Sequence, residues 1–195
     1  MAPVVAASQL TPERIFNVIN AHQQTEAMKA ALELEIFTAI AEGDTTAGAI
    51  ARRSHCAERG VRILCDFLTI HDFLRKDGAR YDLAPESALF LDRHSRAYVG
   101  TVIDFLLAPH LREVHSHMTE AVRRGGSALG DGLLGVENPD WVTFAQAMMP
   151  LMFMSAEIMA SELRKGGQAN KVLDIAAGHG MFGIAVAKQN PGAQI

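Results

Sequence analysis

AERGVRILCDFLTIHDFLRKDGARYDLA, residues 57–84, is the stretch that decides the fold expected of this chain. Its first part places apolar residues three and four positions apart, which predicts a helix with one buried face. Its second part carries Lys76-Asp77-Gly78 between two short extended runs, a pattern typical of a hairpin. Upstream, residues 11–43 predict helices that stop at Gly43, and residues 45–55 predict a further short helix. Helices followed by a hairpin are the winged-helix pattern.

Downstream of the hairpin the chain predicts more helices. Residues 85–126 carry helical patterns with a break near Pro109. A glycine-rich loop over 125–140 follows, and Asp140 is expected to cap a methionine-rich helix that runs from Trp141 to about Lys165. Pro150 lies inside this helix and is expected to kink or divide it.

The last segment, KVLDIAAGHGMFGIAVAKQNPGAQI, predicts a strand, a glycine turn, a helix and the start of a second strand. The turn has the pattern D-x-A-x-G-x-G, formed by Asp174, Ala176, Gly178 and Gly180. Glycines allow positive φ and close approach of a ligand, and a helix N-terminus favours an anion. The turn alone also fits a nicotinamide site, a flavin site or a plain strand–helix connection, since Gly183 could supply a third glycine.

Several stretches together resemble one family. They are ALELEIFTAIAEGDTTAGAIARR, ERGVRILCDFLTIHDFLRKDGARYDLAPESALFL, DWVTFAQAMMPLMFMSAEIMASEL and VLDIAAGHG. In this order they resemble the N-terminal half of the small-molecule O-methyltransferases of plant and bacterial secondary metabolism. The resemblance runs from about Ala21 to Ile195, just past the family's first S-adenosylmethionine motif. Ala176 departs from that motif, which usually has glycine there.

The resemblance implies a mainly α fold, in which a winged-helix-like dimerisation domain precedes the first βα unit of a class I methyltransferase domain. The expected boundaries are a flexible tail over 1–10, the dimerisation domain over 11–125, the loop and long connecting helix over 126–165, and the start of a truncated methyltransferase domain over 166–195. It also implies a homodimer.

The resemblance further implies S-adenosylmethionine as cofactor, bound through Asp174, Ala176, Gly178 and Gly180, and methyl transfer to a hydroxyl of a small aromatic substrate. The pocket residues it implies on the long helix are Phe144, Met148 and Met152, for which plain core packing is the alternative. The family's ribose-binding acid and catalytic histidine lie beyond Ile195, so no catalytic residue is assigned and this part alone is expected to be inactive.

Composition limits the other possibilities. A net charge of −4 gives no global attraction to nucleic acid or to an anionic membrane. The two cysteines and the scattered histidines have no metal-site spacing, no apolar stretch reaches the length of a membrane span, and a cytoplasmic location is expected. A winged-helix DNA-binding protein remains an alternative, disfavoured by Asp66 and Asp72 on the would-be recognition helix. A stand-alone dimerisation or regulatory fragment is a third reading.

Overall fold

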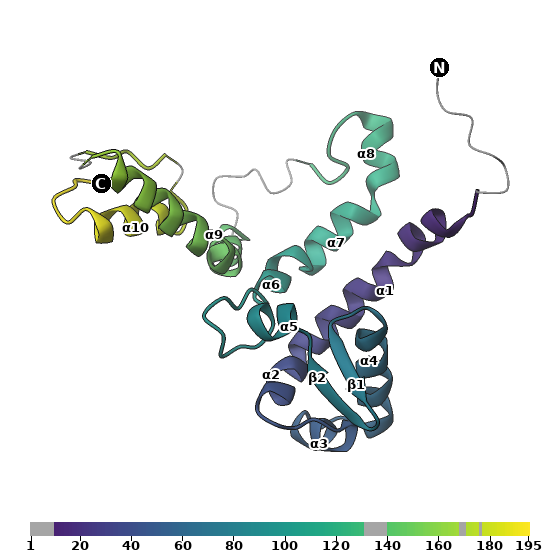
Figure 1. Cartoon of the computed structure of the whole chain (residues 1–195). Helices are drawn as coiled ribbons and strands as arrows, with labels where there is room; N and C mark the ends of the chain where they lie inside the picture. Colours follow the sequence, from purple (N-terminus) through teal and green to yellow (C-terminus); the bar gives the residue numbers. More distant parts are fainter. Residues whose placement is uncertain (1–9, 131–139, 168–170, 176) are drawn as a thin grey trace. The chain divides into compact units, whose positions relative to one another are not determined.

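The structure is a computed structural model that describes residues 10–130, 140–167, 171–175 and 177–195. The chain divides into two compact units, residues 1–93 and 94–195, and each is described by itself (Figure 1). Most of the predicted tail over 1–10 and part of the predicted loop over 125–140 lie outside the described residues.

The first unit is a set of helices with a small hairpin. Its elements are α1 (Glu13–Glu33), α2 (Ile36–Ala41), α3 (Ala47–Arg53), α4 (Glu58–Ile70), β1 (Leu74–Asp77), β2 (Arg80–Leu83) and α5 (Pro85–Phe90). Helix α3 begins where Thr46 Oγ1 accepts a hydrogen bond from Ala49 N–H at 3.3 Å. Glu35 separates α1 from α2 by adopting a left-handed φ of 53°. The sequence pattern had not indicated this break.

The predicted hairpin forms as expected. Strands β1 and β2 are antiparallel, with Leu74 opposite Leu83 and Asp77 opposite Arg80. Gly78 in the connecting turn has φ +56°, which glycine adopts without steric cost. On its other edge β2 meets the segment before α3, where Tyr81 N–H donates to Thr45 C=O at 2.7 Å. Figure 1 shows the hairpin lying along α4.

Helix α4 supplies one wall of the core of the first unit. Val61, Cys65 and Leu68, spaced by four and three residues, are all buried. Burial raises the pKa of the Cys65 thiol to about 12, so this cysteine stays protonated and acts as a small apolar side chain. Ile63 and Ile70 on the same helix are exposed. The helix therefore has a packed inner face and a mixed outer face, on which Ile63 and Ile70 are exposed beside Arg59 and Arg62.

The second unit contains α6 (Val102–Leu106), α7 (Pro109–Ser116), α8 (Met118–Arg124), α9 (Asp140–Lys165) and α10 (Met181–Gln189). The predicted break near Pro109 is confirmed, because α6 ends at Leu106 and Pro109 opens α7. Thr101 Oγ1 donates to Ala147 C=O at 3.1 Å and fastens the start of α6 to α9.

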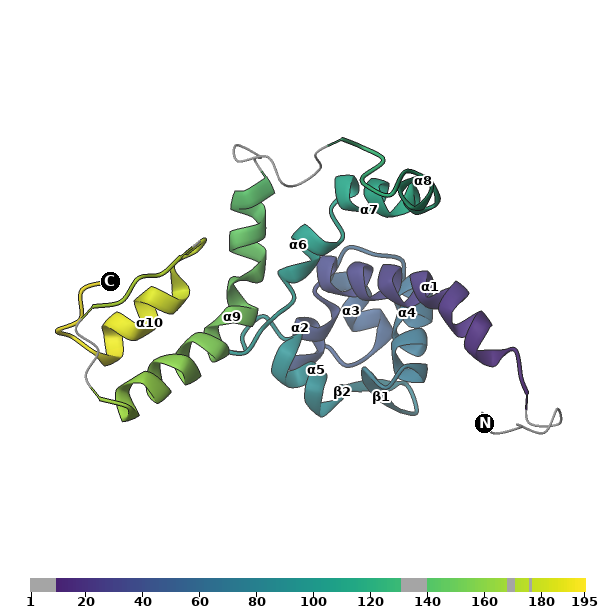
Figure 2. The same cartoon turned by 90° about the horizontal axis from the view of Figure 1, so that it is seen from above.

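Helix α9 is the longest element of the described chain. Pro150 does not divide it, and Figure 2 shows α9 changing direction along its length, as a proline inside a helix causes. Contrary to the sequence expectation, α9 is long and apolar enough to cross a membrane by length and composition alone. Mostly buried core helices pass the same test, but only 11% of the apolar window of α9 is buried. The buried residues of α9 are Ala147, Ala156 and Ala160.

The strand predicted at the start of the last segment is reduced to a single bridge. Lys171 pairs with Gln194 in parallel, and Val172 N–H donates to Gln194 C=O at 2.8 Å. The apolar run of Val172, Leu173 and Ile175 predicts a buried strand, but Leu173 and Ile175 are 83% and 81% exposed. An inner strand of a parallel sheet is buried only between neighbouring strands and covering helices, and the described residues provide one short partner.

Candidate functional site

The glycine turn of the second unit has the backbone that its glycines permit. Gly178 and Gly180 have φ of +56° and +69°, in the left-handed region that other residues rarely adopt. Gly180 N–H donates to Ala177 C=O at 2.8 Å, which closes the turn, and Gly180 is the N-cap of α10. Ala176, the remaining motif position, lies outside the described residues.

Asp174 connects the segment before the turn to the first turn of α10. Its carboxylate accepts a hydrogen bond from Gly183 N–H at 3.2 Å. A Cβ at Gly183 would lie 3.2 Å from Asp174 Oδ2 and 3.0 Å from Ile195 Cγ2. Gly183 is therefore needed for close packing of the helix against this segment, a role that the sequence alone did not separate from that of a third dinucleotide-binding glycine.

Helix α10 is held in place by α9, and the two helices lie side by side in Figure 2. Ala156 and Ala160 of α9 are fully buried together with Ala185 and Val186 of α10. Small side chains on both helices allow close approach. Gln189 Nε2 donates to Glu157 Oε2 at 3.0 Å at the other end of the pair. This contact fixes the helix that carries the turn.

The predicted pocket residues of α9 are partly buried. Phe144 belongs to an aromatic cluster, with ring centroids 5.0 Å from Phe105 and 5.9 Å from Trp141. Met148 and Met152 are half-buried farther along the helix. For Phe144 these contacts are those of a core residue, and the pocket role of all three residues stays a prediction.

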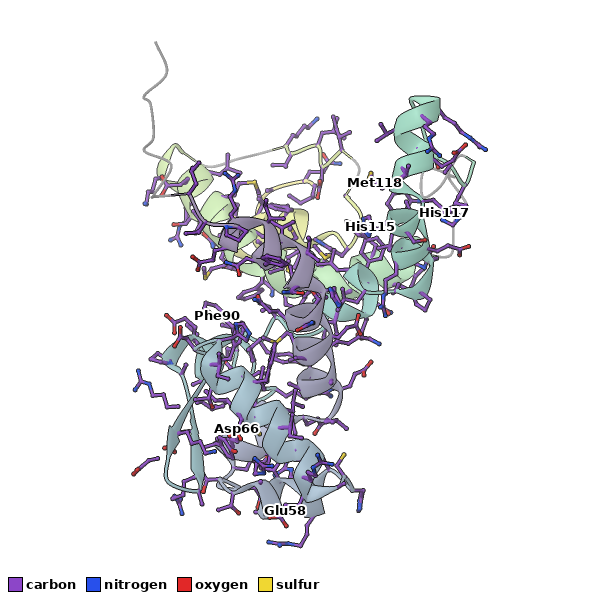
Figure 3. All side chains as sticks on the ribbon, turned by 90° about the vertical axis from the view of Figure 1, so that its right-hand side faces the viewer. Glu58, Asp66, Phe90, His115, His117 and Met118 are labelled. Carbon is purple, nitrogen blue, oxygen red and sulfur yellow. The ribbon has the colours of Figure 1, made fainter. Side chains whose placement is uncertain are left out.

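A second polar cluster lies in the first unit, where α4 meets the hairpin. Asp66, labelled on α4 in Figure 3, is the centre of this cluster. It accepts hydrogen bonds from Tyr81 Oη at 2.7 Å and from Lys76 Nζ at 2.5 Å, and Arg62 Nη1 lies 3.3 Å away. The hydrogen bond from Lys76, followed by that from Tyr81, lowers the pKa of Asp66. A DNA-binding winged helix would need Arg62 and Lys76 free for phosphate contacts, but both form ion pairs with Asp66. The cluster ties the wing to α4.

We expect Asp66→Asn to lower the free energy of unfolding by about 1 kcal/mol near neutral pH, since a part-exposed carboxylate loses its charge-assisted hydrogen bonds. Because folding lowers the pKa of Asp66, its contribution is present above the ordinary aspartate pKa and is lost as pH falls through the folded value. Urea titrations should therefore show the difference from wild type vanishing in acid. Asp82→Asn, on an exposed β2 position, is the matched control and should show no such trend.

The first unit is a winged helix. The second unit pairs α9 with α10, and α10 follows a glycine turn and has its first turn bonded by Asp174. This combination is the architecture of the N-terminal half of a methyltransferase. Residues 16–93 match the family model described as the O-methyltransferase dimerisation domain. The match covers this segment of the chain, and the resemblance seen in the sequence is confirmed. The predicted fold class, mainly α with a winged-helix-like dimerisation domain, is confirmed as well.

Two curated relatives are similar in sequence. The N,N-dimethyltransferase OxyT of Streptomyces rimosus is 28% identical over 141 residues, which is 70% of this chain and 38% of that protein. The tetracenomycin polyketide synthesis 8-O-methyltransferase TcmO of Streptomyces glaucescens is 30% identical over 118 residues, 58% of this chain and 34% of that protein. The chain thus spans little more than a third of either relative.

Solved structures share the fold. A Nostoc punctiforme protein described as an O-methyltransferase is 45% identical with a TM-score of 0.89, covering 96% of this chain and 57% of that one. Human N-acetylserotonin methyltransferase in complex with S-adenosylmethionine has a TM-score of 0.76 at 18% identity, covering 98% of this chain and 60% of that one. The second likeness shows the fold alone.

Proposed function

We propose that this chain is part of an S-adenosylmethionine-dependent O-methyltransferase that acts on a small aromatic hydroxyl substrate. The observation that carries the proposal is the order of two features. An O-methyltransferase dimerisation domain over residues 16–93 is followed by a glycine turn whose Asp174 bonds the first turn of α10. Because the chain spans about a third of its curated relatives, the activity is proposed for a protein that contains it.

The residues of the turn fit one end of this cofactor. Gly178 and Gly180 have left-handed φ and bring bare backbone to the surface, where the amino-acid part of S-adenosylmethionine would lie. When bound, the cofactor supplies an electrophilic methyl group on a sulfonium. Asp174 and Gly183 hold α10 against the preceding segment and so fix the turn. The family resemblance assigns the ribose and the substrate proton to residues beyond Ile195.

The atom that receives the methyl group, oxygen or nitrogen, distinguishes this proposal from an N-methyltransferase. TcmO is named for an O-methyl transfer and OxyT for N,N-dimethyl transfer, so hydroxyl and amine acceptors both occur among the relatives. The test is incubation of the gene product that contains this chain with methyl-labelled S-adenosylmethionine and paired phenols and anilines. Label on oxygen is expected. Label on nitrogen alone, or none on any acceptor, would overturn the assignment.

We expect a polypeptide of residues 1–195 alone to bind S-adenosylmethionine weakly, with a dissociation constant above roughly 1 mM, and to transfer no methyl group. The turn meets only the amino-acid end of the cofactor. Calorimetry on this polypeptide beside the gene product provides the measurement. Micromolar binding together with transfer to a phenol would show that the ribose and proton partners lie within these residues.

We also propose that the first unit forms a homodimer through α1. Ile15, Phe16, Val18 and Ile19 are each more than half exposed at the start of this helix. A contiguous apolar surface of this kind marks an interaction site. The match to a dimerisation domain supports a second copy of the chain as the partner.

The double substitution Ile15→Asp, Ile19→Asp is expected to weaken the dimer at least about a hundredfold, because two buried isoleucines contribute about 3 kcal/mol or more and charge opposes burial. Sedimentation across a concentration series measures the change. Asn17→Asp introduces charge on the opposite face of α1 and should leave the dimer intact. Equal weakening by the control, or a wild-type monomer at micromolar concentration, would contradict the proposed interface.

A further inference from the structure

The first turn of α10 is capped by two side chains rather than left open. Besides the bond from Gly183 N–H to Asp174, Met181 N–H donates to His179 Nδ1 at 3.1 Å. His179 lies two residues before Met181, inside the glycine turn, and is half-buried. Two of the first three N–H groups of α10 are therefore bonded within the chain, although such groups are the ones that a bound anion would use.

The hydrogen bond to His179 requires one particular form of its imidazole. Nδ1 accepts only when it carries a lone pair, so the ring must be neutral with its proton on Nε2. Protonation would turn Nδ1 into a donor that faces another donor. It would also place a positive charge at the positive end of α10. Both effects oppose the observed turn.

We propose that neutral His179 is a positioning residue that holds the glycine turn on α10, and that protonation of His179 releases this cap. Asp174 is the carboxylate bonded to the same first turn of α10, through Gly183 N–H, whereas Lys188 and Glu157 lie at the other end of the helix. The role of this turn in binding S-adenosylmethionine rests on the proposed function. The cap and its pH dependence do not.

Substitution of His179 by asparagine or by glutamine tests which of the two ring nitrogens forms the cap. The Asn side-chain oxygen can occupy the place of Nδ1, whereas that of Gln reaches the place of Nε2. His179→Asn should therefore keep the cap at every pH, and His179→Gln should lack it. Amide hydrogen exchange of α10 reports the cap without any ligand, and the amides of α4 in the other unit serve as an internal reference.

The experiment follows exchange in the 195-residue chain from about pH 8 to about pH 5. After correction for intrinsic exchange, protection of α10 in the wild type should fall about three- to thirtyfold in acid, the range for loss of a side-chain cap. His179→Asn should stay protected throughout, and His179→Gln should be low throughout. A flat wild-type profile, or His179→Gln that matches the wild type, would overturn the proposal whether or not the cofactor binds.

Discussion

Leu68→Ala will lower the free energy of unfolding of the first unit by about 2–5 kcal/mol, measured by urea titration at a concentration where sedimentation gives monomers. Leu68 is 1% exposed and lies on the inner face of α4 with Val61 and Cys65. Truncation removes its buried apolar surface and leaves a cavity that the surrounding helices fill only in part.

The matched control is Ile70→Ala, two residues along the same helix, where the side chain is 76% exposed. It should change the unfolding free energy of the monomer by less than about 0.5 kcal/mol. The pair of variants tests which face of α4 is the inner one. Equal effects at both positions would mean that the helix is packed differently from the structure.

Ala156→Leu is expected to reduce the amide protection of α10 by roughly five- to 150-fold, equivalent to about 1–3 kcal/mol of overpacking. Ala156 of α9 is fully buried where this helix packs against Ala185 and Val186 of α10. A leucine there pushes α10 away from α9. The Asp174–Gly183 hydrogen bond and the glycine turn would then loosen with the helix.

Ser155→Leu, on the neighbouring exposed position of α9, introduces the same side chain without entering the interface. In this variant the amide protection of α10 should stay within about twofold of that in the wild type. Loss of protection in both variants would indicate a general effect on α9. No loss in either would mean that α10 does not depend on this contact.

The sequence predicted the first unit well because its signals are local. The spacing of Val61, Cys65 and Leu68 shows which face of α4 is buried, and Gly78 marks the hairpin turn. The break at Glu35 escaped prediction, since neither glycine nor proline marks it. Its left-handed φ is maintained by burial of the residues that follow, Ile36 and Phe37.

The sequence predicted which residues form the candidate site, but not which hydrogen bonds they make. The pattern identified Asp174, Gly178 and Gly180, and the left-handed φ of both glycines agrees with the reason for choosing them. The pattern did not indicate that Asp174 bonds Gly183 N–H, or that His179 caps α10. A side chain that can accept a hydrogen bond has many possible donors, and only the folded backbone brings one of them within reach.

The sequence by itself determined the order of elements, the winged-helix class of the first unit and its O-methyltransferase resemblance, because periodicity, turn residues and motif order are properties of neighbouring residues. Tertiary structure alone decided that Leu173 and Ile175 are exposed, that α9 continues through Pro150, and that two side chains cap α10. Burial and capping depend on which segments meet in space. Such meetings are set by packing between distant parts of the chain, such as that of α9 on α10.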